Sequence, residues 1–292
     1  QNEADADGFE LIIQSPGVPL EIPMLARARA RGARIIGELE LAAESLQGSI
    51  IGITGANGKT TTTALTGHIF RHAGRDTLVG GNIGTPVTDL VPASHPGAAV
   101  VLELSSFQLE TVQSFRAHIG IVLNITPDHL DRHGTMERYI DAKARLVETL
   151  APTGFAVLNA AEPNARSLAS RTAAQVVWFN LDAPVPNGVA CAHDSLWLGH
   201  APLMPVADIP IPGRHNVENV MAAAAAAWLS GIPIPAIAEA VRSFPGVEHR
   251  IEFTRELDGV RYYNDSKATN VDAVEKALDS FPGPLWVILG GK

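Results

Sequence analysis

The chain has 292 residues, of which 46% are hydrophobic and 18% charged, a composition typical of globular rather than disordered proteins. This length suits about two domains with cores of their own. The net charge of −9 and the lack of any Lys/Arg run exclude a general nucleic-acid surface, and no apolar run is long enough to predict a membrane span. The single cysteine, Cys191, cannot form an internal disulfide, which fits a reducing cytoplasm.

The two ends of the sequence predict that it is part of a longer chain. It does not begin with Met, and it stops directly after the apolar run 285–289. The acidic residues 1–7 lack the charged and then apolar segments of a signal peptide.

The first residues predict an α/β segment. The expected elements are strands at 9–13 and 34–37 and helices at 22–31 and 38–46. The first strand ends at Ser15-Pro16-Gly17, a turn signal. This alternation is half of a doubly wound unit, and residues 47–49 form a linker after it.

The most specific local motif follows that linker. An apolar strand over 50–53 leads into Gly55-Ala56-Asn57-Gly58-Lys59-Thr60 and then a helix. Glycines let backbone N–H groups converge on an anion, the helix N-terminus adds a positive field, Lys59 is a mobile cation and Thr60 can ligate magnesium. The common phosphate loop has a further glycine where Ile53 stands, so an ordinary strand–turn–helix junction is the alternative. The strand in front and Asn57 within the loop favour phosphate binding.

Strands and helices alternate from residue 50 to about 245, which predicts an α/β fold with a central parallel sheet. Strongly apolar strands suit a sheet covered by helices on both faces. The expected strands are 50–53, 76–79, 98–103, 119–125, 154–159 and 176–179, and the expected helices include 137–150, 216–229 and 234–243. Residues 180–212 predict small hairpins at a sheet edge.

Pro245-Gly246 marks a second boundary. After it, two strands flank Asp258-Gly259, a strong hairpin signal, and a helix over 271–278 and a strand over 285–289 follow. The expected domains are therefore 1–47, 48–246 and 247–292.

Polar residues follow the predicted strand over 98–103. Glu103 ends this strand, and a carboxylate at the carboxyl end of a parallel strand beside a phosphate loop can hold magnesium or position water. The alternative is that Glu103 caps the next helix. Ser105 and Gln108 could bind a substrate or only cap that helix.

A second polar cluster contains Asp128, His129, Asp131 and His133 and follows the strand over 119–125. It could suggest a transition-metal site of the His/Asp hydrolase type, but no other histidine lies in a similar cluster. The preferred interpretation is a single His129 beside a magnesium–phosphate site.

Lys143 and two asparagines each have a structural and a functional interpretation. Taken alone, Lys143 is expected to be solvated, whereas burial near two metal ions would lower its pKa and permit a carbamate. Asn216 could be the N-cap of the Ala-rich helix, or Asn216 and Asn219 could hold the edge of a purine from one helix face.

Further charged residues lie after the second boundary. Asp265 suits a ribose, and Arg250 and Lys267 suit phosphates. Charged residues at hinges are also common in purely structural roles.

Seven motifs, together and in this order, resemble the Mur ligases of bacterial cell-wall synthesis. The resemblance covers nearly the whole chain, and seven motifs in register are highly specific. The motifs are Gly-Ala-Asn-Gly-Lys-Thr at 55–60, Gly-Gly-Asn-Ile-Gly at 80–84, Glu-Leu-Ser-Ser-Phe-Gln-Leu-Glu at 103–110, Asn-Ile-Thr-Pro-Asp-His-Leu-Asp at 124–131, Gly-Arg-His-Asn-Val-Glu-Asn at 213–219, His-Arg at 249–250 and Asn-Asp-Ser-Lys-Ala-Thr-Asn at 264–270. The segment 103–109 resembles the D-glutamate-adding branch of the family.

The resemblance implies the latter part of a UDP-sugar domain, a complete ATPase domain and the start of a Rossmann-like amino-acid domain. It implies that ATP is bound by Gly55, Asn57, Gly58, Lys59, Thr60 and Thr61, with Asn216 and Asn219 at adenine and Arg250, Asp265 and Lys267 at the ribose and phosphates. Two magnesium ions would be held by Thr60, Glu103, His129 and a carbamylated Lys143, and Lys59, Glu103, His129 and Lys143 would be catalytic. The sugar substrate would meet Gly17, Asn82, Ser105 and Gln108.

The implied reaction is amide-bond formation. ATP would phosphorylate the carboxylate of UDP-N-acetylmuramoyl-L-alanine, and the amine of D-glutamate would attack this acyl phosphate. A hinge at 245–250 would bring Arg250 to the nucleotide. A cytoplasmic monomer without nucleic-acid or membrane partners is expected, and the 292 residues alone are expected not to complete the reaction.

Two alternatives stay open at this point. One is another ligase of the superfamily, such as a diamino-acid-adding Mur ligase or a folylpolyglutamate synthase. The other is a nucleotide-binding switch, which would release phosphate whatever the acceptor.

Overall fold

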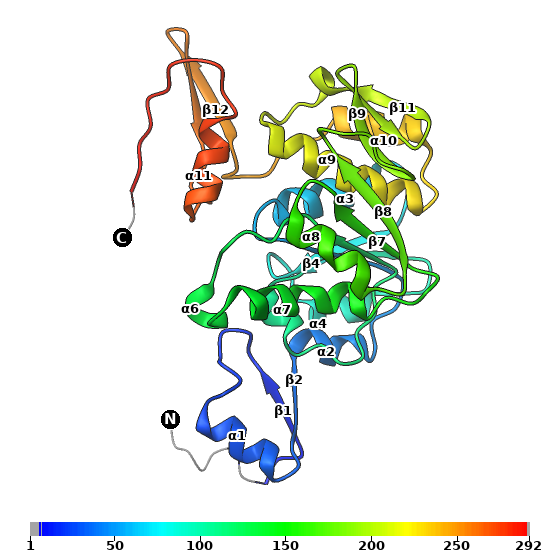
Figure 1. The fold of residues 1–292 in the computed structure, drawn as a ribbon, viewed down its shortest axis with the longest axis vertical. Helices are drawn as coiled ribbons and strands as arrows, with labels where there is room; N and C mark the ends of the chain where they lie inside the picture. The colour runs from blue at the N-terminus through cyan, green and yellow to red at the C-terminus, as the bar shows by residue number, and fades with distance from the viewer. Residues whose placement is uncertain (1–5, 7, 291–292) are drawn as a thin grey trace.

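A computed structural model describes residues 6 and 8–290; the acidic residues 1–5 and 7, and residues 291–292, lie outside this description. The chain is a mixed α/β protein built on a nine-stranded, mostly parallel sheet, as the sequence predicted (Figure 1). Two small two-stranded sheets lie outside it, one toward each end of the chain. None of the described helices is both long and apolar enough to cross a membrane.

The strands are β1 (Leu11–Gln14), β2 (Arg34–Gly37), β3 (Ser49–Thr54), β4 (Thr77–Gly81), β5 (Ala99–Glu103), β6 (Ile119–Val122), β7 (Phe155–Asn159), β8 (Gln175–Asn180), β9 (Gly188–Ala192), β10 (Ser195–Leu198), β11 (Ala201–Pro205), β12 (Glu252–Leu257) and β13 (Val260–Asn264). The α-helices are α1 (Pro23–Ala30), α2 (Glu38–Ala43), α3 (Lys59–His72), α4 (Val87–Leu90), α5 (Ser106–Leu109), α6 (Leu130–His133), α7 (Met136–Glu148), α8 (Pro163–Ser167), α9 (Arg214–Leu229), α10 (Ile234–Arg242) and α11 (Val271–Leu278). Short 3-10 helices cover Val91–Ala93, Leu168–Arg171 and Val206–Asp208.

The strand order of the large sheet creates a place for a ligand. The order is β11-β10-β9-β8-β7-β6-β3-β5-β4, with every pair from β4 to β9 parallel and an antiparallel edge of β9, β10 and β11. The chain leaves β3 for one side of the sheet and later returns to its other side as β6. In open α/β sheets, ligands bind at the carboxyl ends of strands where the order reverses in this way. Here those ends belong to β3, β5 and β6.

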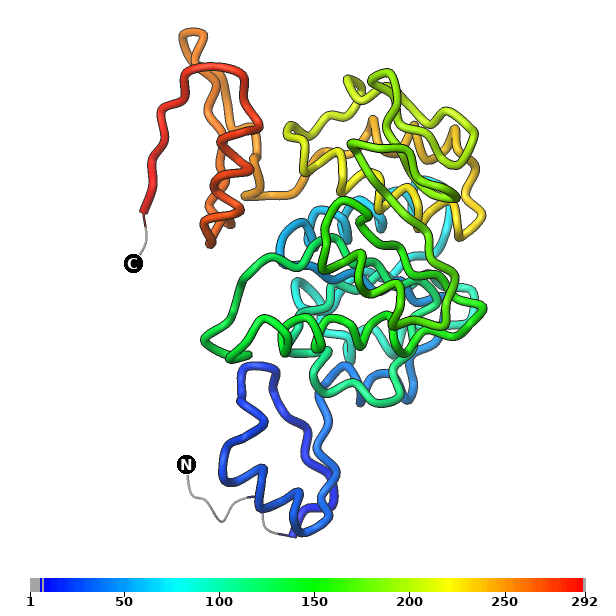
Figure 2. The backbone as a smooth tube through the Cα atoms, viewed as in Figure 1, coloured from blue at the N-terminus to red at the C-terminus, as the bar shows by residue number. Residues whose placement is uncertain are grey.

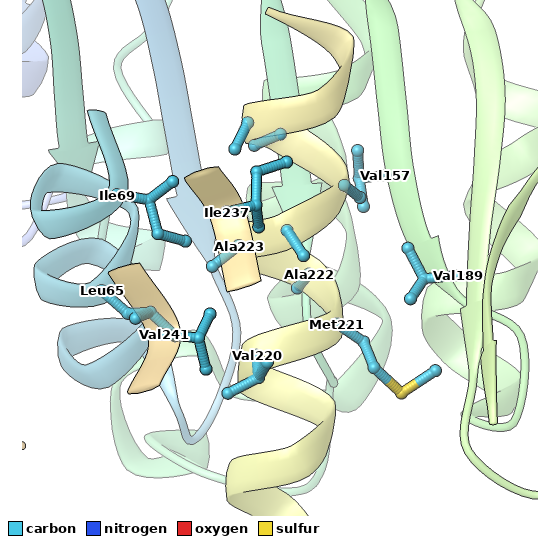
Figure 3. Close-up of a cluster of buried hydrophobic side chains, with 14 of the residues drawn as sticks. Leu65, Ile69, Val157, Val189, Val220, Met221, Ala222, Ala223, Ile237 and Val241 are labelled. Carbon is cyan, nitrogen blue, oxygen red and sulfur yellow. The ribbon is translucent and has the colours of Figure 1, made fainter. Parts of the chain in front are cut away.

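Helices cover both faces of this sheet and bury two separate cores. On one face, α3, α9 and α10 pack against the strands, and Figure 3 shows Leu65 and Ile69 of α3 beside Ile237 and Val241 of α10. The residues Ala222–Ala227 of α9 are all buried, since small side chains let this helix approach the sheet and α3 closely. The opposite core takes buried residues from α2, α4, α5, α7 and α8.

The two small sheets lie apart from this body (Figures 1 and 2). β1 and β2 pair in parallel beside α1, and β12 and β13 form the hairpin that Asp258-Gly259 predicted. The strand predicted over 285–289 is wrong, because this segment pairs with no strand in the described part of the chain. Trp286 and Ile288 are 98% and 99% exposed. An apolar run favours a strand, but only a neighbouring strand can pair with its backbone groups.

Glu40 on α2 is completely buried and ties this helix to a loop of the central body. Its carboxylate accepts backbone N–H groups from Gln113 (2.9 Å), Ser114 (2.6 Å) and Phe115 (3.1 Å), and the Ser114 hydroxyl as well. Burial by itself raises the pKa of this carboxyl, but these hydrogen bonds outweigh burial and hold the pKa below its ordinary value of 4.5.

We expect the Glu40→Gln variant to lose about 2–4 kcal/mol of unfolding free energy at neutral pH, because a neutral amide leaves buried donors poorly satisfied. Since the folded-state pKa is depressed, the contribution of Glu40 is complete above the unfolded-state pKa and disappears as pH falls through the folded-state pKa. Urea unfolding at several pH values should therefore show that the difference in unfolding free energy between the unmodified protein and Glu40→Gln becomes smaller in acid. Glu44→Gln, which removes the exposed partner of Arg34, is the control and should change stability by about 0.5 kcal/mol or less. Equal losses of unfolding free energy in Glu40→Gln and Glu44→Gln would contradict the stabilising role of the buried Glu40 carboxylate.

Candidate functional site

The phosphate-loop motif forms the turn between β3 and α3, at the switch point of the sheet. Gly58 precedes α3 with φ of +86°, a conformation that favours glycine. A Cβ at this position would also lie 2.3 Å from Oδ1 of Asn219. The backbone of Asn57 is held by Asn124, whose side chain accepts its N–H at 2.9 Å and donates to its carbonyl at 3.1 Å. Asn124 lies two residues after the end of β6 and had no assigned role in the sequence; its place after a strand was the available signal.

Two lysines converge on one backbone oxygen of this loop. The Nζ of Lys59 donates to the carbonyls of Gly55 (2.9 Å) and Ala56 (2.7 Å), and the Nζ of Lys143 donates to the same Gly55 oxygen at 2.8 Å. Burial lowers the pKa of Lys59, and it lowers that of Lys143 far more, with further lowering by the charge of Lys59. An incoming anion would stabilise the charged form of Lys59, which burial disfavours.

The expectation that Lys143 is solvated is wrong. Lys143 is 2% exposed and its amine also lies 4.7 Å from the ring centre of Tyr139 and 3.4 Å from Thr54 Oγ1. Tyr139, Lys143 and Leu146 are four and three residues apart, so they share the buried face of α7. This spacing was visible in the sequence, but a lysine within an apolar stripe is usually exposed at its end.

Glu103 has one carboxylate oxygen without a protein partner. It is 2% exposed, and its Oε1 accepts from Asn82 Nδ2 at 3.1 Å, while Oε2 is buried and makes no hydrogen bond with any described residue. A buried carboxylate oxygen of this kind requires a cation or donor. Hard oxygen ligands of this kind suit magnesium. The unsatisfied oxygen of Glu103 therefore fits a magnesium ion.

A cleft beside the loop runs under the start of α9. Asn216 is not the N-cap of α9, because Gly213 holds that position and Asn216 lies inside the first turn. The amide of Asn216 donates to Pro212 O at 2.6 Å and accepts from Asn219 at 3.1 Å, and Asn219 in turn accepts from Thr62 at 3.2 Å. The cleft is lined by the predicted residues Asn57, Gly58, Thr61, Asn216, Asn219, Arg250 and Asp265, and also by His215 and Lys276, which sequence reasoning missed.

The C-terminal segment reaches this loop directly. Arg250 donates to Thr60 Oγ1 at 3.1 Å. Asn270 donates to Asn57 at 3.3 Å and to Asp128 at 3.4 Å. Asp265 accepts the N–H of Ile251 at 3.0 Å, and burial raises its pKa. The residues after the second boundary therefore form one wall of the cleft.

Five predicted residues make other contacts or lie elsewhere. Ser105 and Gln108 form a reciprocal capping box at the start of α5, and their predicted contact with a substrate stays a prediction. His129 contacts Asp128 and the ring of Phe107 rather than Glu103 or Lys143. The side chain of Lys267 is not among the lining groups of the cleft, and Gly17 lies in the exposed turn after β1. In the described part of the chain, no three His, Cys, Asp or Glu side chains are arranged to hold a metal ion.

We expect Gly58→Ala to weaken nucleotide binding about tenfold or more, because the new Cβ meets the Asn219 side chain in addition to the unfavourable φ. Gly74→Ala is the matched control, since Gly74 has φ of +72° but open space around it. Titration with a fluorescent ATP analogue and thermal unfolding of both variants separate the two effects. Similar nucleotide affinities in Gly58→Ala and Gly74→Ala would show that the contact of the new Cβ with Asn219 does not affect nucleotide binding.

The comparisons with known proteins agree with this geometry. Residues 53–227 match the model of the Mur ligase middle domain. The chain belongs to the Mur ligase family. It is 57% identical to a UDP-N-acetylmuramoylalanine--D-glutamate ligase of Solibacter usitatus over all of its residues and 49% identical to the protein of that name from Acidobacterium capsulatum over 97% of them. It spans 66% and 63% of the lengths of these two relatives.

Solved structures show the same fold at low identity. A pseudomurein peptide ligase type C from Methanothermus fervidus matches with a TM-score of 0.66 and 19% identity over 97% of this chain and 66% of that one. MurF from Acinetobacter baumannii matches with a TM-score of 0.67 and 19% identity over 94% and 69%. The Mur ligase fold thus extends beyond the matched middle domain to most of the chain.

Proposed function

We propose that this chain contains the ATPase core of a ligase that adds D-glutamate to UDP-N-acetylmuramoyl-L-alanine in peptidoglycan precursor synthesis. The observation that carries the proposal is the phosphate loop, with the Lys59 amine held at its Gly55 and Ala56 carbonyls, at the switch point of a Mur ligase fold. The names of its relatives support the choice of amino acid and sugar nucleotide.

ATP would lie with its phosphates on the loop and its base in the cleft. The N–H groups of Asn57 to Thr61 and the amine of Lys59 would receive the β- and γ-phosphates. Asn216 and Asn219 would meet adenine. Asp265 would hold the ribose, and Arg250 and Lys267 would meet phosphate oxygens from the third domain.

Glu103 and Thr60 would hold a first magnesium ion, and His129 with a carbamylated Lys143 would serve a second. Magnesium neutralises phosphate charge as it develops during transfer. The low pKa of Lys143 supports the carbamate, since only an uncharged amine reacts with carbon dioxide. Lys59, Glu103, His129 and Lys143 form the proposed catalytic set.

The remaining roles concern the acceptor and the amine. Asn82, Ser105 and Gln108 would face the muramoyl group, and Gly17 its diphosphate. The demand on these residues is to align the L-alanyl carboxylate with the γ-phosphate and then to present the acyl phosphate to the D-glutamate amine. We propose three domains over 1–47, 48–246 and 247–292, a hinge at 245–250, and a cytoplasmic monomer.

The test is phosphate release from Mg–ATP by this chain and by the full product of its gene. UDP-N-acetylmuramoyl-L-alanine is supplied, and D-glutamate is compared with L-glutamate, L-lysine and diaminopimelate. Release that needs both the sugar nucleotide and D-glutamate is the expected result in the full product. Preference for another amino acid would indicate a different Mur ligase, and release that ignores every acceptor would indicate a nucleotide switch.

A further inference from the structure

A buried hydrogen-bonded chain joins two segments that each carry a proposed magnesium ligand. Ser106 Oγ lies 2.9 Å from His133 Nε2, and His133 Nδ1 lies 3.1 Å from Glu110 Oε1. Ser106 is 2% exposed and His133 is 3% exposed. These hydrogen bonds link residues 103–110, which begin with Glu103, to residues 129–133, which begin with His129.

The groups at the two ends of this hydrogen-bonded series decide which atoms donate and which accept. Ser106 Oγ and Glu110 Oε1 lie at the two ring nitrogens of His133. The Glu110 carboxylate accepts from Arg132 at 2.8 Å and faces Nδ1 of His133. Because a carboxylate can only accept, Nδ1 of His133 donates to Glu110, which leaves Nε2 to the Ser106 hydroxyl.

Ring contacts extend the chain to His129. The Phe107 ring stacks on His133 at 5.4 Å and lies 5.1 Å from the ring of His129. The guanidinium of Arg132 lies over the Phe107 ring, 5.5 Å from its centre. His129 itself has φ of +53°, which a non-glycine residue keeps only where its surroundings enforce it. Its carbonyl accepts the N–H groups of Arg132 and His133.

We propose that Ser106, His133 and Glu110 form a positioning network that fixes the imidazole of His129 at the proposed second magnesium site. The network acts through Phe107 and the single turn of α6, and it touches neither metal nor substrate. This inference rests on the proposed function only in giving His129 a metal to bind. Loss of a hydrogen bond to the metal ligand itself typically weakens metal binding about 10- to 100-fold, and this network acts one step further out, through Phe107.

The test uses the whole chain with isotope-labelled histidine and follows the ring signals of His129 by NMR. The Phe107 ring current gives His129 a shifted position in the unmodified protein, and a His129→Gln variant identifies the signal. Ser106→Ala removes one hydroxyl, and His133→Phe keeps the ring stacking but removes both hydrogen bonds. In both variants we expect the His129 signal to move toward its position in an unstructured peptide. Arg171→Gln, which breaks an exposed ion pair with Glu148, is the control and should leave the signal in place.

A paramagnetic readout separates this inference from the proposed function. Mn²⁺ added with a non-hydrolysable ATP analogue should broaden the His129 signal in the unmodified protein, and about tenfold more Mn²⁺ should be needed in Ser106→Ala. An unmoved His129 signal in folded Ser106→Ala and His133→Phe overturns the positioning network. No broadening in the unmodified protein instead removes His129 from the proposed metal site, while the shift of its signal still decides whether the network positions it.

Discussion

Replacing Lys59 by Met is expected to slow phosphoryl transfer about a hundred- to a thousandfold or more, the largest effect predicted for any single side chain here. Its amine lies at the carbonyls of Gly55 and Ala56, the position from which it can move onto a bound phosphate. Methionine keeps the length and apolar stem of the side chain but has no positive charge.

The fold of this variant should survive. The bonds of Lys59 in the structure go only to carbonyls of its own loop, and its amine is unfavourably buried. Removal of its charge also relieves repulsion on Lys143, so the pKa of Lys143 should rise toward the ordinary value. Rapid-quench measurement of phosphate transfer together with thermal unfolding checks both points. If Lys59→Met binds ATP and transfers phosphate at a rate within threefold of that of the unmodified protein, Lys59 does not belong to the catalytic set.

Replacing Glu103 by Gln is expected to reduce the reaction about a hundredfold and to weaken its dependence on Mg²⁺. The amide oxygen of Gln can keep the hydrogen bond from Asn82, so the end of β5 should not move. What disappears is the negative charge of the buried oxygen that no described protein group satisfies. The titration of activity and of nucleotide binding with Mg²⁺ measures this change.

Glu148→Gln provides the control for this carboxylate, because Glu148 is paired with Arg171 on the surface. It should leave the Mg²⁺ titration unchanged. If Glu103→Gln and the control have the same Mg²⁺ dependence, the unsatisfied oxygen of Glu103 does not hold the metal. If Glu103→Gln is unstable at the assay temperature, its nucleotide affinity is measured with and without Mg²⁺ in a cold, stabilising buffer in which it is folded. A lost effect of Mg²⁺ on this affinity then indicates a metal role rather than a structural one.

Much of the fold and part of the site were predictable from the sequence. The apolar strands, the Asp258-Gly259 hairpin and the strand–turn–helix at Gly55 to Thr60 depend on residue type and spacing within one segment. For the same reason the capping box of Ser105 and Gln108 could be anticipated from the sequence. The seven ordered motifs were enough to indicate the family.

Other features depended on contacts between distant segments. Three features arise where β3, β5, β6 and α7 meet. They are the burial of Lys143, the hydrogen bond from the phosphate loop to Asn124 and the unsatisfied oxygen of Glu103. Likewise, residues 285–289 are apolar enough for a strand but lack a described neighbour to pair with.

The sequence by itself therefore determined the local elements, the phosphate loop and the family. Only the tertiary structure decided which polar groups lose water and which carbonyls, amines and carboxylates face one another. The physical reason is that backbone conformation is governed mainly by neighbours in sequence, whereas desolvation and electrostatic pairing depend on groups that folding brings together.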